Sequence, residues 1–232
     1  MITSAKELAE LMPDASQIES NEPEMESSQH YAQLALLVAC LEWLWQDRTD
    51  FFIGANLTIY FSREQLKTRD FRGPDFFLVK PTEKRPRKSW VVWEEGGQYP
   101  DVIIELLSDS TAKVDRTLKK ELYQTRFRTP EYFWFSPETL EIEGYRLVDR
   151  VYENIVPDKI GLWSHVLGLY LSVRNGQLRY VSQDGTLIPT PEEAATQAQA
   201  QAQQAQAQAQ QASDRAEQLA EQLKRLGVDP EA

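Results

Sequence analysis

Glu105 lies in the middle of the segment PDVIIELLS (residues 100–108), where most of its neighbours are apolar. An ionised carboxylate in such a strand is costly to bury unless it is paired, protonated or bound to a metal. Because alternate residues of a strand share a face, Asp101 is expected on the same side as Glu105. Asp75 opens the preceding apolar segment and could bring a second carboxylate to the same place. The sequence therefore indicates a group of carboxylates around one buried strand.

The segment after this strand supplies lysines, Lys119 and Lys120, one of which could reach back to the carboxylates. Two carboxylates and a lysine suit phosphodiester hydrolysis. Carboxylate oxygens are hard ligands for Mg²⁺ or Mn²⁺, and such an ion polarises the phosphate and lowers the pKa of the attacking water. An ammonium group orients that water and offsets the charge that develops in the transition state. These residue types thus predict a metal-dependent hydrolase.

The elements that must position these groups follow from hydrophobic spacing. Apolar residues from Leu34 to Trp45 recur at helical intervals, which predicts an amphipathic helix capped by Ser27 or Ser28. His30, near its start, is expected to serve as a cap or a core residue. A second helix is predicted within residues 109–127, with its apolar side chains inward: Leu118, Leu122 and Tyr123. Strand composition marks four segments: 51–62, 73–80, 100–108 and 131–137.

Residues 81–99, between the second and third of these strands, are expected to form an inserted loop or hairpin. The order helix, three strands, helix, strand predicts an α/β fold in which helices flank a mixed sheet. Residues 1–26 are acidic and lack apolar periodicity, so they are expected to be a loosely ordered lead-in to a domain spanning 27–191.

Residues 192–232 differ in kind from the rest of the chain. Positions 197–212 are only Gln and Ala, a composition with high helix propensity. After them, four apolar residues follow 3-4-3 spacing, which is a short coiled-coil seam: Ala216, Leu219, Leu223 and Leu226. This tail is expected to be a projecting helix that pairs with another copy of the chain or lies on the domain.

The net charge of −11 does not exclude a nucleic-acid partner, because the acids are concentrated at the two ends. Residues 1–47 contain nine acids and one base, and residues 192–232 contain seven acids and three bases. Residues 48–191 hold 20 acids and 21 bases, with basic concentrations at 80–88 and 113–128. Nucleic-acid binding needs a local positive patch rather than a basic chain. From charge alone, a solvated charged face remains an equal alternative.

Other classes are disfavoured by what the chain contains. One cysteine permits no internal disulfide and, with two histidines, no four-ligand Cys/His zinc site. The first residues do not resemble a signal peptide, and the longest apolar run, at 34–41, is too short to cross a membrane. A cytoplasmic protein without a membrane partner is therefore expected.

The run PDVIIELLSDST…DRTLKKELYQTRFRTPEYFWFSP, preceded by GPDFFLV, resembles the Uma-two family of restriction endonuclease-like proteins. The resemblance covers roughly residues 28–190, and the Ala/Gln tail is similar to that of cyanobacterial members. It implies a PD-(D/E)XK nuclease fold and a Mg²⁺- or Mn²⁺-dependent endonuclease acting on DNA. It also implies Asp75 and Glu105 as metal ligands and Lys119 as the helix lysine. Tyr123 completes the motif K-x-x-x-Tyr, and Asp101 matches a further family position.

One departure from the superfamily pattern matters. In D/E-x-K the lysine follows the acid by two residues, and here Leu107 stands at that place. The resemblance suggests that Lys119 supplies the missing ammonium from the helix. Three alternatives stay open: a catalytically inactive nuclease-fold protein that binds nucleic acid, an assembly module that works through the tail, and a structural salt bridge between Glu105 and Lys119 without a metal.

Overall fold

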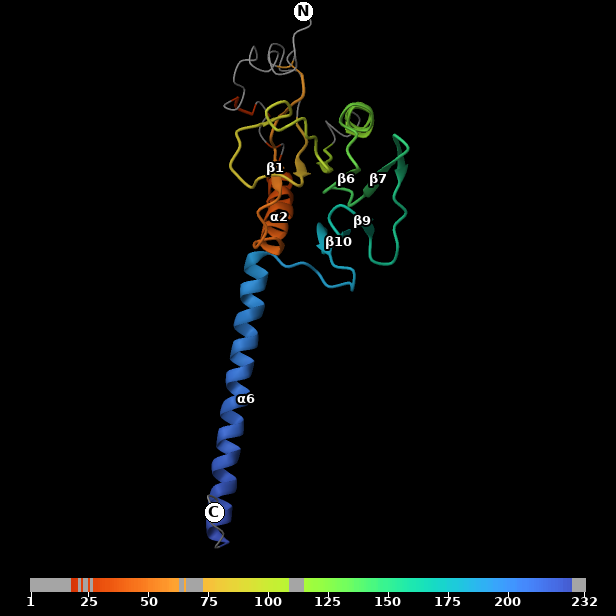
Figure 1. Cartoon of the computed structure of the whole chain (residues 1–232). Coiled ribbons are helices and arrows are strands. Elements are labelled where there is room, and N and C mark those ends of the chain that lie inside the picture. Colours follow the sequence, from red (N-terminus) through yellow and green to blue (C-terminus); the bar gives the residue numbers. More distant parts are fainter. Residues whose placement is uncertain are drawn as a thin grey trace, which may run out of the picture. The chain divides into compact units, whose positions relative to one another are not determined.

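The computed structural model describes residues 18–20, 22, 25, 27–62, 65, 73–108 and 115–226. The chain divides into two compact units, residues 1–188 and residues 189–232, each described separately below (Figure 1). Most of the predicted acidic lead-in, residues 1–26, lies outside the described residues.

The first unit is a mixed α/β structure, as the sequence predicted. Its main sheet has six strands in the order β1-β3-β5-β6-β7-β8. Their bounds are Phe52–Ala55 (β1), Phe76–Val79 (β3), Val102–Leu106 (β5), Glu131–Phe135 (β6), Ile142–Val148 (β7) and Val151–Asn154 (β8). Only β5 and β6 run parallel, and the other neighbours are antiparallel.

Two smaller sheets complete this unit. One is the three-stranded sheet of β9 (Leu162–Ser164), β10 (Leu169–Arg174) and β11 (Gln177–Val181). The other pairs β2 (Ile59–Tyr60) with β4 (Trp90–Val91) in parallel. The three-stranded sheet contributes Leu171, Leu178 and Tyr180 to the same apolar core as the main sheet.

The central strand β5 is buried on both faces, as its apolar composition predicted. Val102, Ile104 and Leu106 point into the core that is shared with the first helix. Ile103 and Leu107 point into a second core on the opposite face. Glu105 has the parity of the second set, and its exposed fraction is 0%. A charged side chain is thus enclosed at the centre of the main sheet.

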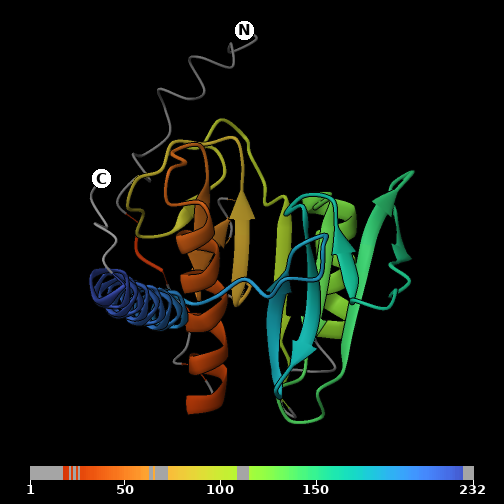
Figure 2. The same ribbon diagram turned by 90° about the horizontal axis from the view of Figure 1, so that it is seen from below.

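The first helix, α2 (Ser28–Leu44), begins where the sequence predicted. Ser27 is its N-cap, and the Ser27 side chain accepts a hydrogen bond from the backbone N–H of His30. Leu34, Leu37 and Leu41 are buried against the sheet. Figure 2 shows α2 running beside the strands.

The helix between β5 and β6 is wound partly as a π-helix. It comprises η1 (Asp115–Lys119), α5 (Lys120–Leu122) and η2 (Tyr123–Phe127), so a single α-turn separates two i→i+5 segments.

The predicted inward position of Leu118 is wrong. The exposed fraction of the Leu118 side chain is 65%. The face of the helix toward the sheet is formed by Lys119, Tyr123 and Phe127, which follow one another at intervals of four residues. Leu118 lies one residue off that series, which rotates its side chain toward solvent. Leu122 is partly buried and Tyr123 is fully buried, as predicted.

One strand prediction needs correction. The segment 51–62 is not one strand: Asn56 has a left-handed backbone (φ 46°), which ends β1 before β2 begins. For the segment 81–99 the sequence left a loop or a hairpin open, and the structure has a loop whose short strand β4 pairs in parallel with β2 rather than with a neighbour in its own segment. Trp90 is fully buried there and stacks on Phe52.

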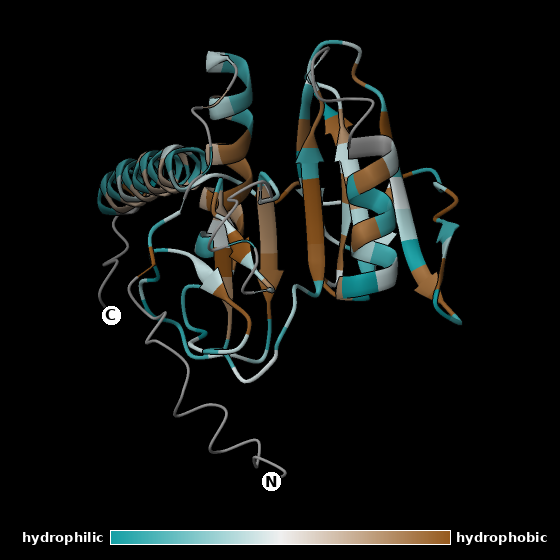
Figure 3. Ribbon diagram, turned by 90° about the horizontal axis from the view of Figure 1, so that it is seen from above, coloured by the Kyte–Doolittle hydropathy of each residue, from teal (hydrophilic) through white to brown (hydrophobic). Residues whose placement is uncertain are grey.

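The second unit contains α6 (Pro191–Arg225), a continuous helix of 35 residues, which confirms the predicted C-terminal helix. Residues 197–212 of this helix are only glutamine and alanine, and Figure 3 shows the helix with bands of different hydropathy. Leu219 and Leu226 are exposed by 51% and 78%. Among the described residues, no helix combines enough length and apolarity to span a membrane.

Tyr180 offers a test of the core of the first unit. Its side chain is fully buried, and its hydroxyl has no hydrogen-bond partner among the described residues. Burial raises the pKa of Tyr180 well above its ordinary value. Removing an unpaired buried hydroxyl is neutral or favourable. We expect Tyr180→Phe to leave the free energy of unfolding unchanged or to raise it by about 1 kcal/mol in urea titrations.

The matched control is Tyr152→Phe, because the Tyr152 hydroxyl is also buried but donates to the Thr129 carbonyl at 2.9 Å. This variant is expected to lose about 1 kcal/mol. Equal losses in the two variants would contradict the assignment of the Tyr180 hydroxyl as unpaired.

Candidate active site

Asp75 immediately precedes β3, and Glu105 lies in the neighbouring strand β5. The register pairs Phe76 with Ile104, so one residue further along, Asp75 stands opposite Glu105. Directly opposed residues of antiparallel strands have Cβ atoms about 5 Å apart. The backbone N–H of Asp75 donates to Glu105 Oε2 at 3.4 Å. The structure therefore brings together the two carboxylates that the sequence singled out.

Both carboxylate oxygens of Glu105 accept hydrogen bonds from the helix between β5 and β6. Lys119 Nζ lies 3.1 Å from Oε2, and the Tyr123 hydroxyl donates to Oε1 at 2.7 Å. The Lys119 side chain is 16% exposed, whereas that of Glu105 is not exposed at all. The Lys119 ammonium thus reaches the buried carboxylate and keeps some access to solvent. Leu107 shares the face of Glu105 but contributes only apolar contacts there.

Asp75 is fixed through its backbone as well as its side chain. Its carboxylate Oδ2 accepts a hydrogen bond from the Leu106 N–H at 2.7 Å, and its carbonyl accepts one from the Asn56 N–H at 2.7 Å. Because Leu106 follows Glu105, the Asp75 side chain is tied to the backbone that carries the other acid. The two acids and Lys119 consequently form one cluster at the carboxyl end of β5.

Asp101 lies at the other end of this strand and is not brought into the cluster. It precedes Glu105 by four residues, a separation of about 13 Å along a strand. Its carboxylate accepts a hydrogen bond from the backbone N–H of Lys80 at 2.7 Å. Burial raises the pKa of Asp101, and burial also lowers the pKa of the neighbouring Lys80. Asp101 therefore stabilises a strand end and is remote from Glu105.

The donor set suits a hard divalent cation held by few protein ligands. Among the described residues, no three His, Cys, Asp or Glu side chains gather as a ready-made metal cage. Mg²⁺ is commonly bound through one or two carboxylates, with water or substrate oxygens completing its coordination. Asp75 and Glu105 would be those carboxylates. A fully buried glutamate in an apolar strand is the observation on which this fit rests.

Lys120 does not reach the carboxylates but lies over an aromatic ring. Its ammonium lies 3.3 Å from the centre of the Tyr145 ring, and burial lowers its pKa. The attraction of Glu143 partly offsets that change. The two adjacent lysines therefore have different surroundings: Lys119 faces Glu105, and Lys120 covers an aromatic ring on β7.

The basic segment 80–88 is engaged in contacts within the protein. The Arg87 guanidinium donates to both carboxylate oxygens of Glu95 and lies 4.9 Å from the centre of the Trp90 ring. Lys84 and Lys88 form ion pairs with acids of other segments. In the second basic concentration, residues 113–128, Lys113 lies outside the described residues. The positive charges of the first basic concentration, residues 80–88, thus hold a loop together, and Trp90 in this loop is fully buried.

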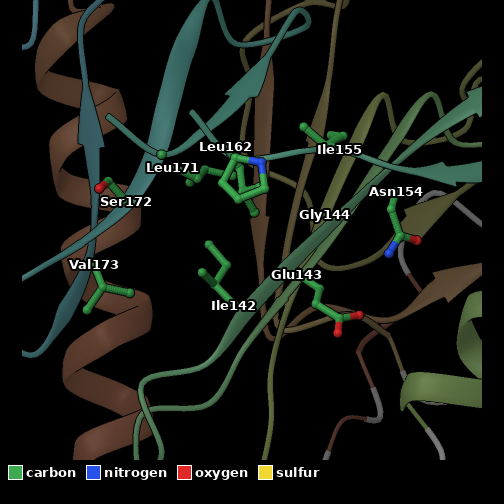
Figure 4. Close-up of a pocket in the computed structure, with 11 residues that line it drawn as sticks. Ile142, Glu143, Gly144, Asn154, Ile155, Leu162, Leu171, Ser172 and Val173 are labelled. Atoms are coloured by element: carbon green, nitrogen blue, oxygen red, sulfur yellow. The ribbon is translucent and has the colours of Figure 1, made fainter. Parts of the chain in front are cut away.

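A separate pocket of 330 Å³ opens between the β7–β8 edge and the three-stranded sheet (Figure 4). Figure 4 shows the polar ends of Glu143 and Asn154 on one side of it and apolar side chains on the other. Its lining includes none of Asp75, Glu105 or Lys119. The pocket is therefore distinct from the acid–lysine cluster.

The sequence did not reveal one contact beside the cluster. His30 is buried, and its Nε2 lies 3.1 Å from the carbonyl oxygen of Leu107, two residues after Glu105. The spacing of the first helix predicted a cap or core role for His30 but not its partner. No local pattern could have identified that partner, because 77 positions separate the two residues.

The fold and the cluster define a mixed α/β protein with an acid–acid–lysine group at the carboxyl end of its central strand. The sequence profile of the Uma2 family, described as "Putative restriction endonuclease", matches residues 16–174. The chain belongs to this family, which is the Uma-two family that its motifs resemble.

A crystal structure from Anabaena variabilis, described as a "putative nuclease", is similar to the chain. The two share 18% identity with a TM-score of 0.44, over 62% of this chain and 75% of the other. No curated protein matches the chain.

Proposed function

We propose that this protein is a Mg²⁺- or Mn²⁺-dependent endonuclease that hydrolyses phosphodiester bonds in DNA. The proposal rests on its membership of the Uma2 family. The observation that carries the site is the fully buried Glu105, which lies opposite Asp75 and has Lys119 Nζ 3.1 Å from Oε2. With a single, buried cysteine, Cys40, the chain suits the cytoplasm, where we expect it to act.

In this proposal Asp75 and Glu105 hold the divalent ion, which would polarise the scissile phosphate and lower the pKa of the attacking water. Lys119 orients that water and offsets the negative charge that develops on the phosphate oxygens. Tyr123 keeps the Glu105 carboxylate in place through the bond to Oε1. Lys119 would thus act from a helix in the place of the lysine that most PD-(D/E)XK sequences carry two residues after the acid.

A salt bridge with only a structural role is the strongest competing explanation for Glu105 and Lys119. Buried ion pairs are weak contributors to stability, because the cost of removing both charges from water consumes most of their attraction. Apolar side chains of similar size often replace them without loss. A buried pair that lies opposite a second acid, Asp75, is therefore better explained by chemistry than by stability.

The test is conversion of supercoiled plasmid to nicked or linear DNA by the full chain, with Mg²⁺, with Mn²⁺ and with chelator. We expect cleavage only when a divalent ion is present. Cleavage that chelator leaves unchanged, or none with any of the ions, would contradict the proposal. Salt-sensitive DNA binding without cleavage would instead support an inactive nuclease-fold protein that binds nucleic acid.

Metal removal is expected to separate activity from stability. In the structure, Lys119 and Tyr123 already satisfy the buried Glu105 carboxylate without an ion. Chelator should therefore abolish cleavage and shift the Tm by no more than about 3 °C, the effect of less than 1 kcal/mol in a domain of this size. A large fall in Tm would show that the ion, rather than Lys119, compensates the charge of Glu105.

Self-association through the tail is a second candidate role, favoured by the spacing of its apolar residues. The seam seen at Ala216, Leu219, Leu223 and Leu226 continues back through the Gln/Ala stretch in unbroken 3-4 alternation. Its earlier members are Ala195, Ala198, Ala202, Ala205, Ala209 and Ala212. Alternating steps of three and four place side chains in the line along which two helices pack. Since α6 is one continuous helix of about 52 Å, we propose that two copies pair along it.

The seam can be tested with identical substitutions on and off its line. We expect Ala205→Asp to convert a dimer to a monomer, since it places a charge between the paired helices. Ala207→Asp, two residues away and off the seam, should leave the dimer intact. Light scattering measures the mass, which for one chain is 26.7 kDa. A monomeric wild type, or equal effects of the two variants, would contradict pairing along this line.

A further inference from the structure

The first turn of α2 contacts the carboxyl ends of the two parallel strands. His30 reaches the carbonyl of Leu107 after β5, with 3.1 Å between Nε2 and the oxygen. Gln29 Nε2 donates to the carbonyl of Pro137, after β6, at 2.9 Å. Both contacts thus join α2, which packs on one face of the sheet, to the carboxyl ends of the strands, where Glu105 lies. His30 is only 4% exposed, so its bond is shielded from water.

The hydrogen bonds of His30 identify its protonated nitrogen. A carbonyl oxygen can only accept, so Nε2 must donate to Leu107. In the neutral ring Nδ1 is then an acceptor, and the Ser27 hydroxyl, 2.8 Å away, donates to it. The same Ser27 oxygen accepts from the His30 backbone N–H. Both ring nitrogens therefore have hydrogen-bond partners, which hold the imidazole in one orientation.

Three backbone groups of the two residues after Glu105 have hydrogen-bond partners in other segments. The Leu106 N–H donates to Asp75 Oδ2, and the Leu107 N–H donates to the Phe135 carbonyl at 2.7 Å. The His30 side chain lies at hydrogen-bonding distance from the Leu107 carbonyl. Without His30, the Leu107 carbonyl would lose this hydrogen bond, and the strand end would keep only those of the Leu106 and Leu107 N–H groups.

We propose that His30 is a positioning residue of the active site: it fixes the carboxyl end of β5, so that Glu105 stays aligned with Asp75 and Lys119. This inference rests on the proposed nuclease function. His30 itself touches neither of the acids nor the lysine, so it would act through the Leu107 backbone. Supporting contacts of this kind typically change metal affinity or activity by about 10- to 100-fold.

Gln33 provides a matched control on the same helix. It is also 4% exposed, and its side-chain amide donates to the Leu178 carbonyl and accepts from the Leu178 N–H, both at 2.9 Å. Leu178 belongs to β11 in the three-stranded sheet, away from β5. Loss of either side chain removes buried hydrogen bonds, but only loss of His30 removes one next to Glu105.

The experiment compares His30→Phe, His30→Gln and Gln33→Leu in the full chain. It measures the rate of plasmid cleavage, the Mn²⁺ concentration for half-maximal cleavage, and the Tm. We expect His30→Phe to slow cleavage or to raise the Mn²⁺ requirement by about 10- to 100-fold. His30→Gln keeps a nitrogen donor at similar reach and should recover most of the loss. Gln33→Leu should lower the Tm and leave the Mn²⁺ requirement near that of wild type.

A His30→Phe variant within about twofold of wild type, or a Gln33→Leu variant with an equal shift in Mn²⁺ requirement, would overturn the inference, since the effect would fall below the range expected of supporting contacts. If His30→Phe does not fold, His30→Leu, which is smaller and also lacks a nitrogen donor, takes its place in the same measurements. Active wild type with an unaffected His30 variant refutes the inference alone. Inactive wild type with every ion refutes the proposed function, and the inference with it.

Discussion

Replacing Glu105 by glutamine is expected to reduce metal-dependent plasmid cleavage by at least about 10²- to 10³-fold, the usual scale for removal of one preorganised electrostatic group. Glutamine keeps the size of the side chain and removes its charge. The expected cause is loss of the buried carboxylate that lies opposite Asp75 and accepts from both Lys119 and Tyr123. Binding of Mn²⁺, measured by titration of the ion alone, should fall in parallel.

Stability must be measured with the same variant, because Glu105→Gln leaves the Lys119 ammonium without its counter-charge. Removing one partner of a buried pair can cost about 3–5 kcal/mol. The access of Lys119 to solvent should reduce that cost. Glu143→Gln is the matched control, since Glu143 is an exposed acid on β7, outside the cluster. Unchanged cleavage in a folded Glu105→Gln protein would remove Glu105 from the mechanism.

The Lys119→Met variant should lose cleavage by a similar factor of about 10²-fold or more, but it should still bind Mn²⁺. Methionine retains much of the apolar stem and lacks the ammonium that lies 3.1 Å from Glu105 Oε2. Because the ammonium competes with a cation for this oxygen, its loss should keep or increase the affinity for the ion. Glu105 variants should lose both cleavage and Mn²⁺ binding, whereas Lys119 variants should lose cleavage alone. A Lys119→Met protein that cleaves at the wild-type rate would leave the salt bridge as a structural pair.

A relocated lysine gives a sharper form of this experiment. Leu107 shares the face of Glu105 and is 2% exposed. Adding Leu107→Lys to Lys119→Met returns the ammonium to the strand position of the D/E-x-K pattern and restores the charge balance around Glu105. Partial recovery of cleavage is expected, provided that the Tm shows a folded protein. Lys120→Met, as a control, should retain activity, since Lys120 lies over Tyr145.

The elements that surround Glu105 could be predicted from the sequence because their signals are local. The burial of strand β5 could be predicted because all of its residues other than Glu105 are apolar, and Ser27 predicted the start of α2. Asp75 was correctly predicted to lie near Glu105. In an antiparallel pair the start of one strand lies beside the end of the other, and Asp75 stands at the start of β3. Lys119, however, was chosen over Lys120 only through the family resemblance, since helical periodicity alone allowed either.

The remaining features depend on contacts between distant segments, which a sequence pattern does not encode. Asp101 has the same strand parity as Glu105, but parity fixes a face and not a position along the strand, so the two lie at opposite ends of β5. The basic segment 80–88 suggested a nucleic-acid surface until its partners, among them Glu95, were located. The contact of His30 with Leu107 likewise required the placement of α2 on the sheet.

The two π-helical segments affect how the helix between β5 and β6 should tolerate a change in its length. A π turn arises when one extra residue is accommodated within an α-helix. In an ordinary α-helix, loss of one residue turns every later side chain by about 100°. In η2 the same loss would allow the π turn to return to ordinary winding, and the tighter winding would offset the missing residue, so that Phe127 stays near the face that carries Lys119 and Tyr123. A one-residue deletion should therefore be tolerated better in η2 than in the α-helix α2.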